Sequence, residues 1–201
     1  MLREFIFSIK IQKSALFIDF VIKRSAVRQT FLISLSFLLY SIEVYIINMI
    51  NILVSACLLG ATCRYDGKSK PCQAIMKFCD SADYIKFIPI CPECDGGLPI
   101  PRPPAEIVGE RVINNEGRDV TEAYEKGGLH ALEIAQTHDC KFAVLKEKSP
   151  SCGCKYVYDG TFSGKLVDGK GITTQILSEN GIVCIGENEL ENIHNFLQIL
   201  N

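Results

Sequence analysis

Short apolar runs recur along the chain from Met49 onward, and four of them have the length of buried strands. They are rich in Val, Ile, Leu and Phe, which is typical of strands covered on both faces. Segments with helical spacing alternate with these runs, and this alternation predicts an α/β fold: a small, mostly parallel, Rossmann-like sheet flanked by helices. The four predicted strands are Asn51 to Ala56, Lys86 to Ile90, Lys141 to Lys146 and Ile182 to Ile185.

Four further segments are predicted to be helices. The longest follows a capping signal at Asp119 or Thr121, and Gly127-Gly128 is expected to weaken its middle. Asn180-Gly181 is expected to end another of them. The four predicted helices are Ala74 to Cys79, Asp119 to Thr137, Ile172 to Glu179 and Leu190 to Leu200.

The first 48 residues differ in composition from the rest of the chain. Residues 1–48 contain no Gly, Pro or Cys. Their uncharged run, Gln29 to Ile42, is shorter than the roughly 20 apolar residues of a membrane span, and Glu43 interrupts its continuation. Met49 stands directly before the first predicted strand. We therefore expect an N-terminal extension, residues 1–48, that is helical or unstructured, and an α/β domain, residues 49–201.

Two interpretations of this extension are open. In the first, Met49 is the natural start and residues 1–48 are translated upstream sequence without a function. In the second, the extension is a genuine helix that associates with a membrane or a partner. No stable membrane association is expected of the α/β domain itself.

The charge balance and the cysteine content restrict the classes of function. The 21 basic and 23 acidic residues argue against a broad phosphate-binding face for duplex nucleic acid, and favour a small substrate. Ten cysteines in 201 residues is a high density. The N-terminus lacks the pattern of a secretory signal, so we expect a cytoplasmic protein, in which clustered thiols serve as metal ligands or catalytic groups rather than disulfides.

The positions of three cysteines relative to the predicted strands indicate a shared site. Cys57 follows the first strand, Cys91 follows the second, and Cys152 lies in the loop after the third. Ligands of open α/β sheets bind beyond the carboxyl ends of the strands, where these three thiols would meet. Thiolates are soft ligands that suit zinc or the iron of an iron–sulfur cluster.

The other cysteines have competing interpretations. Cys91-x-x-Cys94 has the spacing of a redox pair or of half a zinc site, and Cys152-x-Cys154 allows the same uses. A structural zinc site usually consists of two close pairs, and Cys57 with Cys63 does not match that spacing. Four cysteines are interpreted as small core residues: Cys72, Cys79, Cys140 and Cys184.

Several polar residues of the same loops are candidates for catalysis. Glu93 is either a proton-transfer group or a solvated carboxylate, while Ser149 and Ser151 either orient a substrate or cap a turn. Arg64 and Arg102 are expected to form structural ion pairs with carboxylates of these loops. Three histidines lie in or near predicted helices and are interpreted as structural or exposed: His130, His138 and His194.

Three motifs in these loops resemble the signature of the DUF523 family, whose characterised type is a 2-thiouracil desulfidase. The first motif is VSACLLG at 54–60 with CRYDG at 63–67. The second is CPE at 91–93 with GGLPIPR at 96–102, and the third is LK at 145–146 with SPSCG at 149–153. Order and spacing agree, and the resemblance covers essentially residues 50–200 and none of the extension.

The resemblance implies a [4Fe-4S] cluster that is held by only three protein cysteines. Carried onto this chain, the ligands are Cys57, Cys91 and Cys152. The remaining iron would act as a Lewis acid on the sulfur of a thiocarbonyl and take sulfide as water adds at carbon, without a net redox change. Glu93 would relay protons, and Ser149 or Ser151 would position the ring. Two further thiols are competing ligand candidates, Cys63 and Cys94.

The predicted function is therefore an iron–sulfur-dependent desulfidase that removes sulfur from a thiolated pyrimidine such as 2-thiouracil. The alternative is an iron–sulfur or zinc binding module for electron transfer or sensing. Free 2-thiouracil, a thiolated nucleoside and a thiolated tRNA base share the same thiocarbonyl, and the near-neutral charge disfavours the tRNA.

Overall fold

The computed structural model describes residues 33–40, 49–81 and 84–189. The chain forms two compact units, Met1–Met49 and Ile50–Asn201. In the first unit, residues 33–40 are helical. Among the helices of the described ranges, none has both the length and the apolar character needed to cross a membrane. The predicted helix from Leu190 to Leu200 and most of the N-terminal extension lie outside the described residues.

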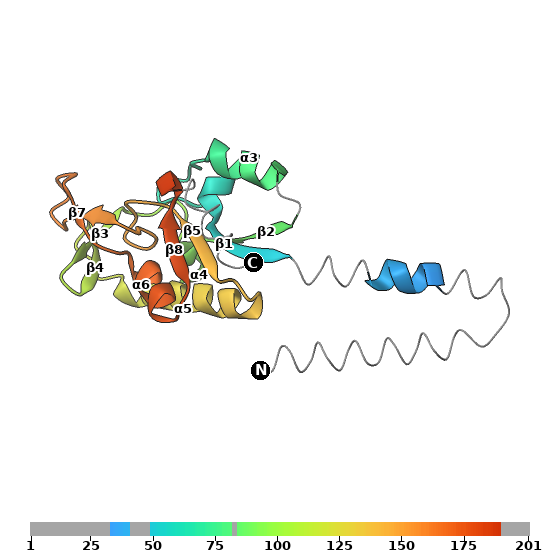
Figure 1. Cartoon of the computed structure of the whole chain (residues 1–201). Coiled ribbons are helices and arrows are strands. Elements are labelled where there is room, and N and C mark those ends of the chain that lie inside the picture. The colour runs from blue at the N-terminus through green and yellow to red at the C-terminus, as the bar shows by residue number, and fades with distance from the viewer. Residues whose placement is uncertain (1–32, 41–48, 82–83, 190–201) are drawn as a thin grey trace. The chain divides into compact units, whose positions relative to one another are not determined.

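The second unit is built on a four-stranded parallel sheet with the strand order β2-β1-β5-β8 (Figure 1). The predicted fold class and all four predicted strands are confirmed. Because β1 is central, Leu53 pairs with Ile88 on one side and with Ala143 on the other. The strands are β1 (Ile50–Ser55), β2 (Ile85–Ile90), β5 (Phe142–Leu145) and β8 (Val183–Gly186).

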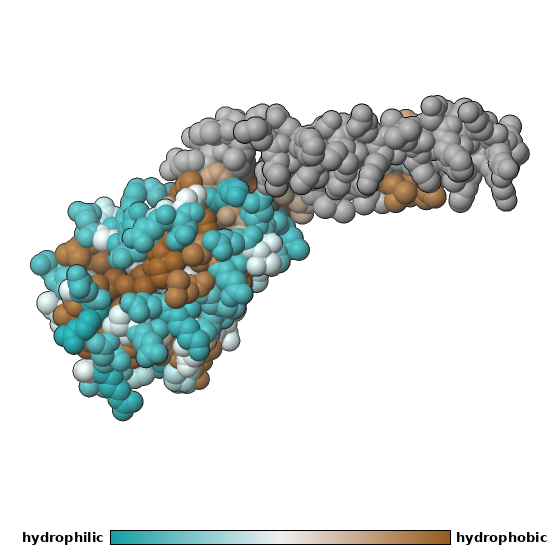
Figure 2. Space-filling model, turned by 90° about the horizontal axis from the view of Figure 1, so that it is seen from below, coloured by the Kyte–Doolittle hydropathy of each residue, from teal (hydrophilic) through white to brown (hydrophobic). Residues whose placement is uncertain are grey.

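Helices cover both faces of this sheet. Successive strand residues point to opposite sides, so the apolar residues of β1 need a packing partner on each face. Leu53 packs in a core cluster with residues of α5 (Thr121–Thr137) and α6 (Ile172–Glu179). Its neighbour Val54 packs in a second cluster with the 3₁₀ helix η1 (Ala56–Leu59) and with α3 (Gln73–Ser81). Figure 2 shows one face of the unit, which is mainly hydrophilic with a hydrophobic band across its middle.

Helix α5 runs unbroken through Gly127 and Gly128, contrary to the expected weakness there. Both glycines lie in close packing, and at Gly127 the neighbour is backbone that cannot give way. A Cβ on Gly127 would overlap the carbonyl of Pro92 in the short helix α4 (Pro92–Asp95), and a Cβ on Gly128 would lie 2.6 Å from Cδ1 of Ile176. Packing against neighbouring elements therefore outweighs the low helix propensity of glycine, and it holds α4 closely against α5. At the helix start, the Asp119 carboxylate accepts the backbone N–H of Thr121.

Two antiparallel hairpins and two short helical turns complete the unit and were not predicted. Their strands are only three or four residues long and partly exposed, so they lack the apolar runs that marked the central sheet. The helical turns are α4 and the 3₁₀ helix η2 (Glu187–Glu189). The hairpins pair β3 (Ala105–Val108) with β4 (Arg111–Asn114), and β6 (Tyr156–Tyr158) with β7 (Leu166–Asp168).

Candidate active site

The candidate site lies at the carboxyl ends of three adjacent strands, β2, β1 and β5. Cys57 is in η1 directly after β1, and Cys91 is the residue that precedes α4 after β2. The loop after β5 carries Cys152. The backbone N–H of Lys146 donates to the Ser55 hydroxyl at 3.0 Å, which joins β1 and β5 at this edge. The predicted placement of these cysteines after three neighbouring parallel strands is confirmed.

Four of the thiols form a close group between the loops after β1 and β2. The sulfur atoms of Cys91 and Cys94 are 3.4 Å apart, and both approach the carbonyl oxygen of Cys63, at 3.6 and 3.5 Å. A hydrogen bond with the Cys57 thiol is the largest cause that raises the pKa of Cys63 to about 11. Burial and the neighbouring Cys91 raise the pKa of Cys94 to about 11 as well. The pKa values of Cys63 and Cys94 therefore depend on the thiols beside them.

Cys152 approaches this group from the loop after β5. Its side chain is buried, and burial is the main cause that raises its pKa to about 12. The charges of Glu93 and Cys91 add to this increase, while hydrogen bonds with the Ser55 and Ser151 hydroxyls oppose it. Cys152 therefore lies within electrostatic reach of the second cysteine loop and of Glu93.

The Glu93 carboxylate is held from two sides. Arg102, whose side chain is buried, donates to its Oε2 through Nη2 at 2.7 Å and through Nε at 2.8 Å. The Ser149 hydroxyl donates to the other oxygen, Oε1, at 3.3 Å. Arg102 also donates to the Cys63 carbonyl at 3.0 Å. Glu93 and Arg102 together thus connect all three loops, and the interpretation of Glu93 as a freely solvated group does not hold.

The two serines of the loop after β5 face different surroundings. Besides its bond to Glu93, the Ser149 hydroxyl accepts the backbone N–H groups of Ser151 and Cys152 at 3.1 and 3.2 Å. The Ser151 hydroxyl is fully buried and bonds to the Thr173 hydroxyl at 2.8 Å. Ser149 is therefore directed toward Glu93, whereas Ser151 is directed toward α6.

Other candidates have structural surroundings. Arg64 pairs with Asp66 at 3.3 Å, as expected of a structural ion pair. The exposed ring of His130 lies 3.8 Å from the Asp95 carboxylate, and His138 follows the last residue of α5. His194 and the side chain of Cys79 lie outside the described part of the chain. Three predicted core cysteines are in or against the hydrophobic clusters: Cys72, Cys140 and Cys184.

Two buried residues of the site were not singled out for it by the sequence. Arg102 was predicted only as a structural partner, although it lies in one of the three motifs. Tyr124 of α5 is buried, and burial together with the nearby Glu93 charge raises the pKa of its hydroxyl. Tyr124 lies 31 positions beyond Glu93 in an ordinary helical pattern, so no local signal marks it.

The donor set fits a multi-iron cluster better than a single ion. Within the described ranges, no three His, Cys, Asp or Glu side chains are placed to hold one metal ion, and a tetrahedral zinc needs four ligands within about 2.3 Å. An iron–sulfur cluster instead takes thiolates on separate irons, so its ligands can come from loops that are further apart. Neighbouring cations would also favour the thiolate form of cysteines whose pKa is raised.

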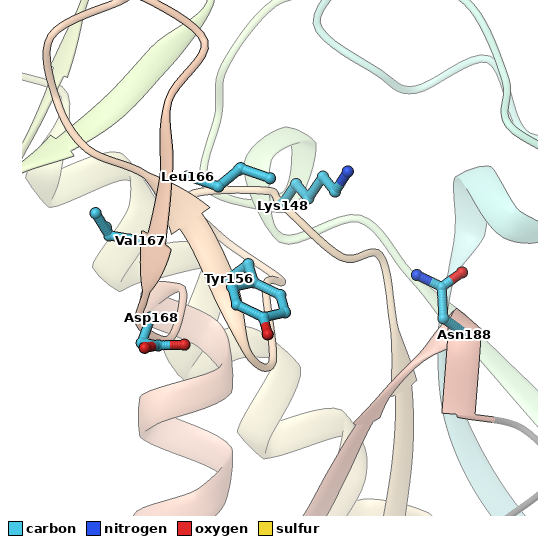
Figure 3. Close-up of a pocket in the computed structure, with 6 residues that line it drawn as sticks. All are labelled: Lys148, Tyr156, Leu166, Val167, Asp168 and Asn188. Atoms are coloured by element: carbon cyan, nitrogen blue, oxygen red, sulfur yellow. The ribbon is translucent and has the colours of Figure 1, made fainter.

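An open cavity of about 780 Å³ borders the loop after β5 (Figure 3). It contains none of the predicted site residues, but Lys148 on its wall is the chain neighbour of Ser149. The wall comes from this loop, from the hairpin of β6 and β7, and from η2. The lining residues are Lys148, Tyr156, Leu166, Val167, Asp168 and Asn188.

Comparisons with known proteins agree with these motifs. The profile of the 2-thiouracil desulfurase family matches residues 52–189. An uncharacterised protein of Bacillus subtilis (strain 168), YbbK, is 41% identical over 152 residues, which are 71% of this chain and 99% of the relative. A solved structure named [4Fe-4S]-dependent thiouracil desulfidase TudS is 40% identical, with a TM-score of 0.69 over 75% of this chain and 99% of that one. The chain therefore belongs to the 2-thiouracil desulfurase family.

Proposed function

We propose that this protein is a [4Fe-4S]-dependent desulfidase that replaces the sulfur of a thiolated pyrimidine, such as 2-thiouracil, by oxygen from water. The observation that carries the proposal is the Glu93 carboxylate, which Arg102 and Ser149 hold beside thiols from three loops. Membership of the family and the name of the solved relative support the same reaction. No net oxidation or reduction occurs.

We assign Cys57, Cys91 and Cys152 as the three cluster ligands, one from each loop. Their convergence at the ends of β1, β2 and β5 supports this assignment. When bound, the cluster supplies an iron without a protein ligand, which acts as a Lewis acid on the thiocarbonyl sulfur. The protein's own side chains then need to hold the ring and handle the protons.

Glu93 is assigned the proton transfer. Arg102 occupies its Oε2, so Oε1, on the side of Ser149, is the oxygen that takes a proton from the attacking water. The water oxygen forms a bond to the ring carbon, the carbon–sulfur bond breaks, and sulfur leaves with the bonding electrons as sulfide. Both protons of the water end on this sulfide, one of them by way of Glu93, and the ring carbon is left as a carbonyl. The ion pair with Arg102 keeps the carboxylate oriented throughout.

Ser149 is assigned the orientation of the ring, because its hydroxyl is directed at Glu93. Ser151, bonded to Thr173, supports this loop from the side of α6. The substrate class is a thiolated pyrimidine as a small molecule. A thiolated nucleoside carries the same group, and a near-neutral net charge of −2 makes a tRNA the less favoured form. We infer a cytoplasmic location, because a reducing compartment preserves the free thiols.

A second function deserves a test because Cys63 and Cys94 lie against Cys91. If either thiol bound the fourth iron, the cluster would be fully ligated by protein, as in electron carriers and sensors. The double variant C63S/C94S separates the two functions. A desulfidase keeps its cluster and its sulfide release in this variant, whereas a fully ligated module loses cluster content or changes its cluster spectrum.

The deciding experiment is anaerobic reconstitution with iron and sulfide, followed by incubation with 2-thiouracil without any electron donor. Equal amounts of uracil and sulfide should form, and the protein without iron should form neither. Reconstituted protein with a full cluster that releases no sulfide from any thiopyrimidine would overturn the desulfidase and favour the electron-transfer or sensing module.

A further inference from the structure

The carboxylate of Glu147 is buried at the end of β5, with 7% of the residue exposed. Its Oε1 accepts the backbone N–H groups of Cys154 and Lys155, each at 3.1 Å. Its Oε2 accepts the N–H of Lys148 at 3.3 Å and approaches that of Tyr156 at 3.4 Å. One side chain thus binds backbone groups on both flanks of the segment that contains Ser149 and Cys152.

The surroundings of Glu147 are built to accept this carboxylate. A Cβ on Gly186 of β8 would lie 2.5 Å from its Oε1, so a larger residue there would displace the carboxylate. The backbone N–H of Glu147 donates to the Glu187 carboxylate at 2.6 Å, and Glu187 also binds Lys146. In the part of the chain that the structure describes, no Lys or Arg forms an ion pair with Glu147 itself. Backbone amides alone offset the cost of its burial.

The opposite side of the same segment is attached to α6. The Thr174 hydroxyl donates to the Cys152 carbonyl at 3.0 Å, and the backbone N–H of Ile172 donates to the Pro150 carbonyl at 2.9 Å. The segment is therefore fixed between α6 and the Glu147 carboxylate. Loss of the Glu147 contacts would free its two flanks while the contacts with α6 remain.

We propose that Glu147 is a positioning residue that sets the Ser149 hydroxyl against Glu93 and directs Cys152 toward the other two cysteine loops. The roles of Ser149 and Cys152 rest on the proposed function. This role requires the carboxylate group and not only a side chain of the same size, because both of its oxygens accept backbone N–H groups. Glutamine has the same size, but its NH₂ group is a donor and would face two of these backbone N–H donors without an acceptor.

The test compares E147Q with E106Q in the full chain. Glu106 in β3 is a matched control: it is 8% exposed and accepts one backbone N–H, from Phe162 at 3.0 Å, but it makes no bond to the segment after β5. In E147Q, amide hydrogen exchange should become about tenfold faster or more across residues 148–156, since buried acceptors have been lost. Reconstituted E147Q should release iron to a chelator several times faster than wild type.

E106Q should change exchange only around β3 and residue 162, and should release iron at the wild-type rate. Wild-type exchange in residues 148–156 of E147Q would overturn the proposal, as would equal iron loss in E106Q and E147Q. The exchange measurement does not require activity. If the wild type holds a cluster but desulfurates nothing, the proposed function fails while the positioning role of Glu147 is still decided.

A double-mutant cycle with S149A tests whether Glu147 acts through Ser149. If it does, E147Q should lower kcat in the wild-type background and lower it by a clearly smaller factor in the S149A background, because coupled residues are not additive. Equal factors in both backgrounds would overturn the part of the proposal in which Glu147 acts through Ser149. KM for 2-thiouracil should change less than kcat, since Glu147 is buried and is assigned no contact with the substrate.

Discussion

The loops that form the site differ in how they are held. The thiol loops, residues 56–72 and 91–102, meet mainly through side chains: the Cys91 and Cys94 thiols and the Arg102 guanidinium all contact the Cys63 carbonyl. One backbone bond, from the N–H of Arg102 to the Tyr65 carbonyl at 2.9 Å, joins them as well. The braced loop, residues 146–155, is held mainly by backbone hydrogen bonds to Glu147 and to α6.

This difference predicts different roles for the two kinds of loop. Cys63, Cys91 and Cys94 of the thiol loops are partly exposed, whereas the braced loop presents a buried Cys152 beside Ser149. Substitutions in the thiol loops should therefore act through ligation and through Glu93. Substitutions in the braced loop should act through position.

The largest effect is expected from the three assigned ligands. C57A, C91A and C152A should each lose most of the cluster, measured as iron per chain and by visible absorption after reconstitution. C140A is the control, because Cys140 is a buried core residue and should cost only stability. Normal iron content in C152A would show that the braced loop supplies no cluster ligand and that the ligands come from the thiol loops alone.

The next effect concerns Glu93, which touches both kinds of loop. E93Q should lower turnover by something on the order of 10² to 10⁴-fold, the usual range for lost acid–base catalysis. Its cluster spectrum and iron content should stay at wild-type values, because Glu93 is assigned no iron. Full activity of E93Q would exclude the proton-transfer role, and loss of iron would make Glu93 part of the cluster's binding site.

A smaller effect separates the two serines of the braced loop. S149A should lower kcat by roughly tenfold and retain the cluster, because it removes one hydroxyl bond to Glu93. S151A should instead lower stability by about 1–3 kcal/mol, since it leaves the buried Thr173 hydroxyl without this partner. Sulfide-release kinetics and thermal unfolding measure the two effects. The reverse pattern would make Ser151 the residue that orients the ring.

The sequence predicts the sheet well because its strands are continuous apolar runs buried on both faces. Leu53, Ala143 and Ile185 lie where the pattern places them. The site was predictable as far as it depends on topology, since residues after adjacent parallel strands must share one edge. That Cys57 and Cys91 follow neighbouring strands is such a case.

The contacts across the site were not predictable in the same way, because they depend on the directions of individual side chains. No sequence pattern favours Ser149 over Ser151, and only their partners, Glu93 and Thr173, distinguish them. Glu147 was missed because a carboxylate beside two lysines resembles a solvated surface residue. Its burial follows from the turn of the braced loop, which no local pattern encodes.

The smallest effect is expected from removal of residues 1–48. All the residues assigned to the thiol loops and the braced loop lie in the unit Ile50–Asn201, and the relative YbbK is matched over 99% of its length by 152 residues of this chain. A chain that begins at Met49 should therefore stay in solution, hold the same iron per chain and release sulfide at the same rate as the full chain. Sedimentation and the iron and sulfide assays measure these quantities side by side. If the shortened chain precipitates while the full chain stays dissolved, residues 1–48 are part of the fold, and the two kinds of loop do not suffice for the site.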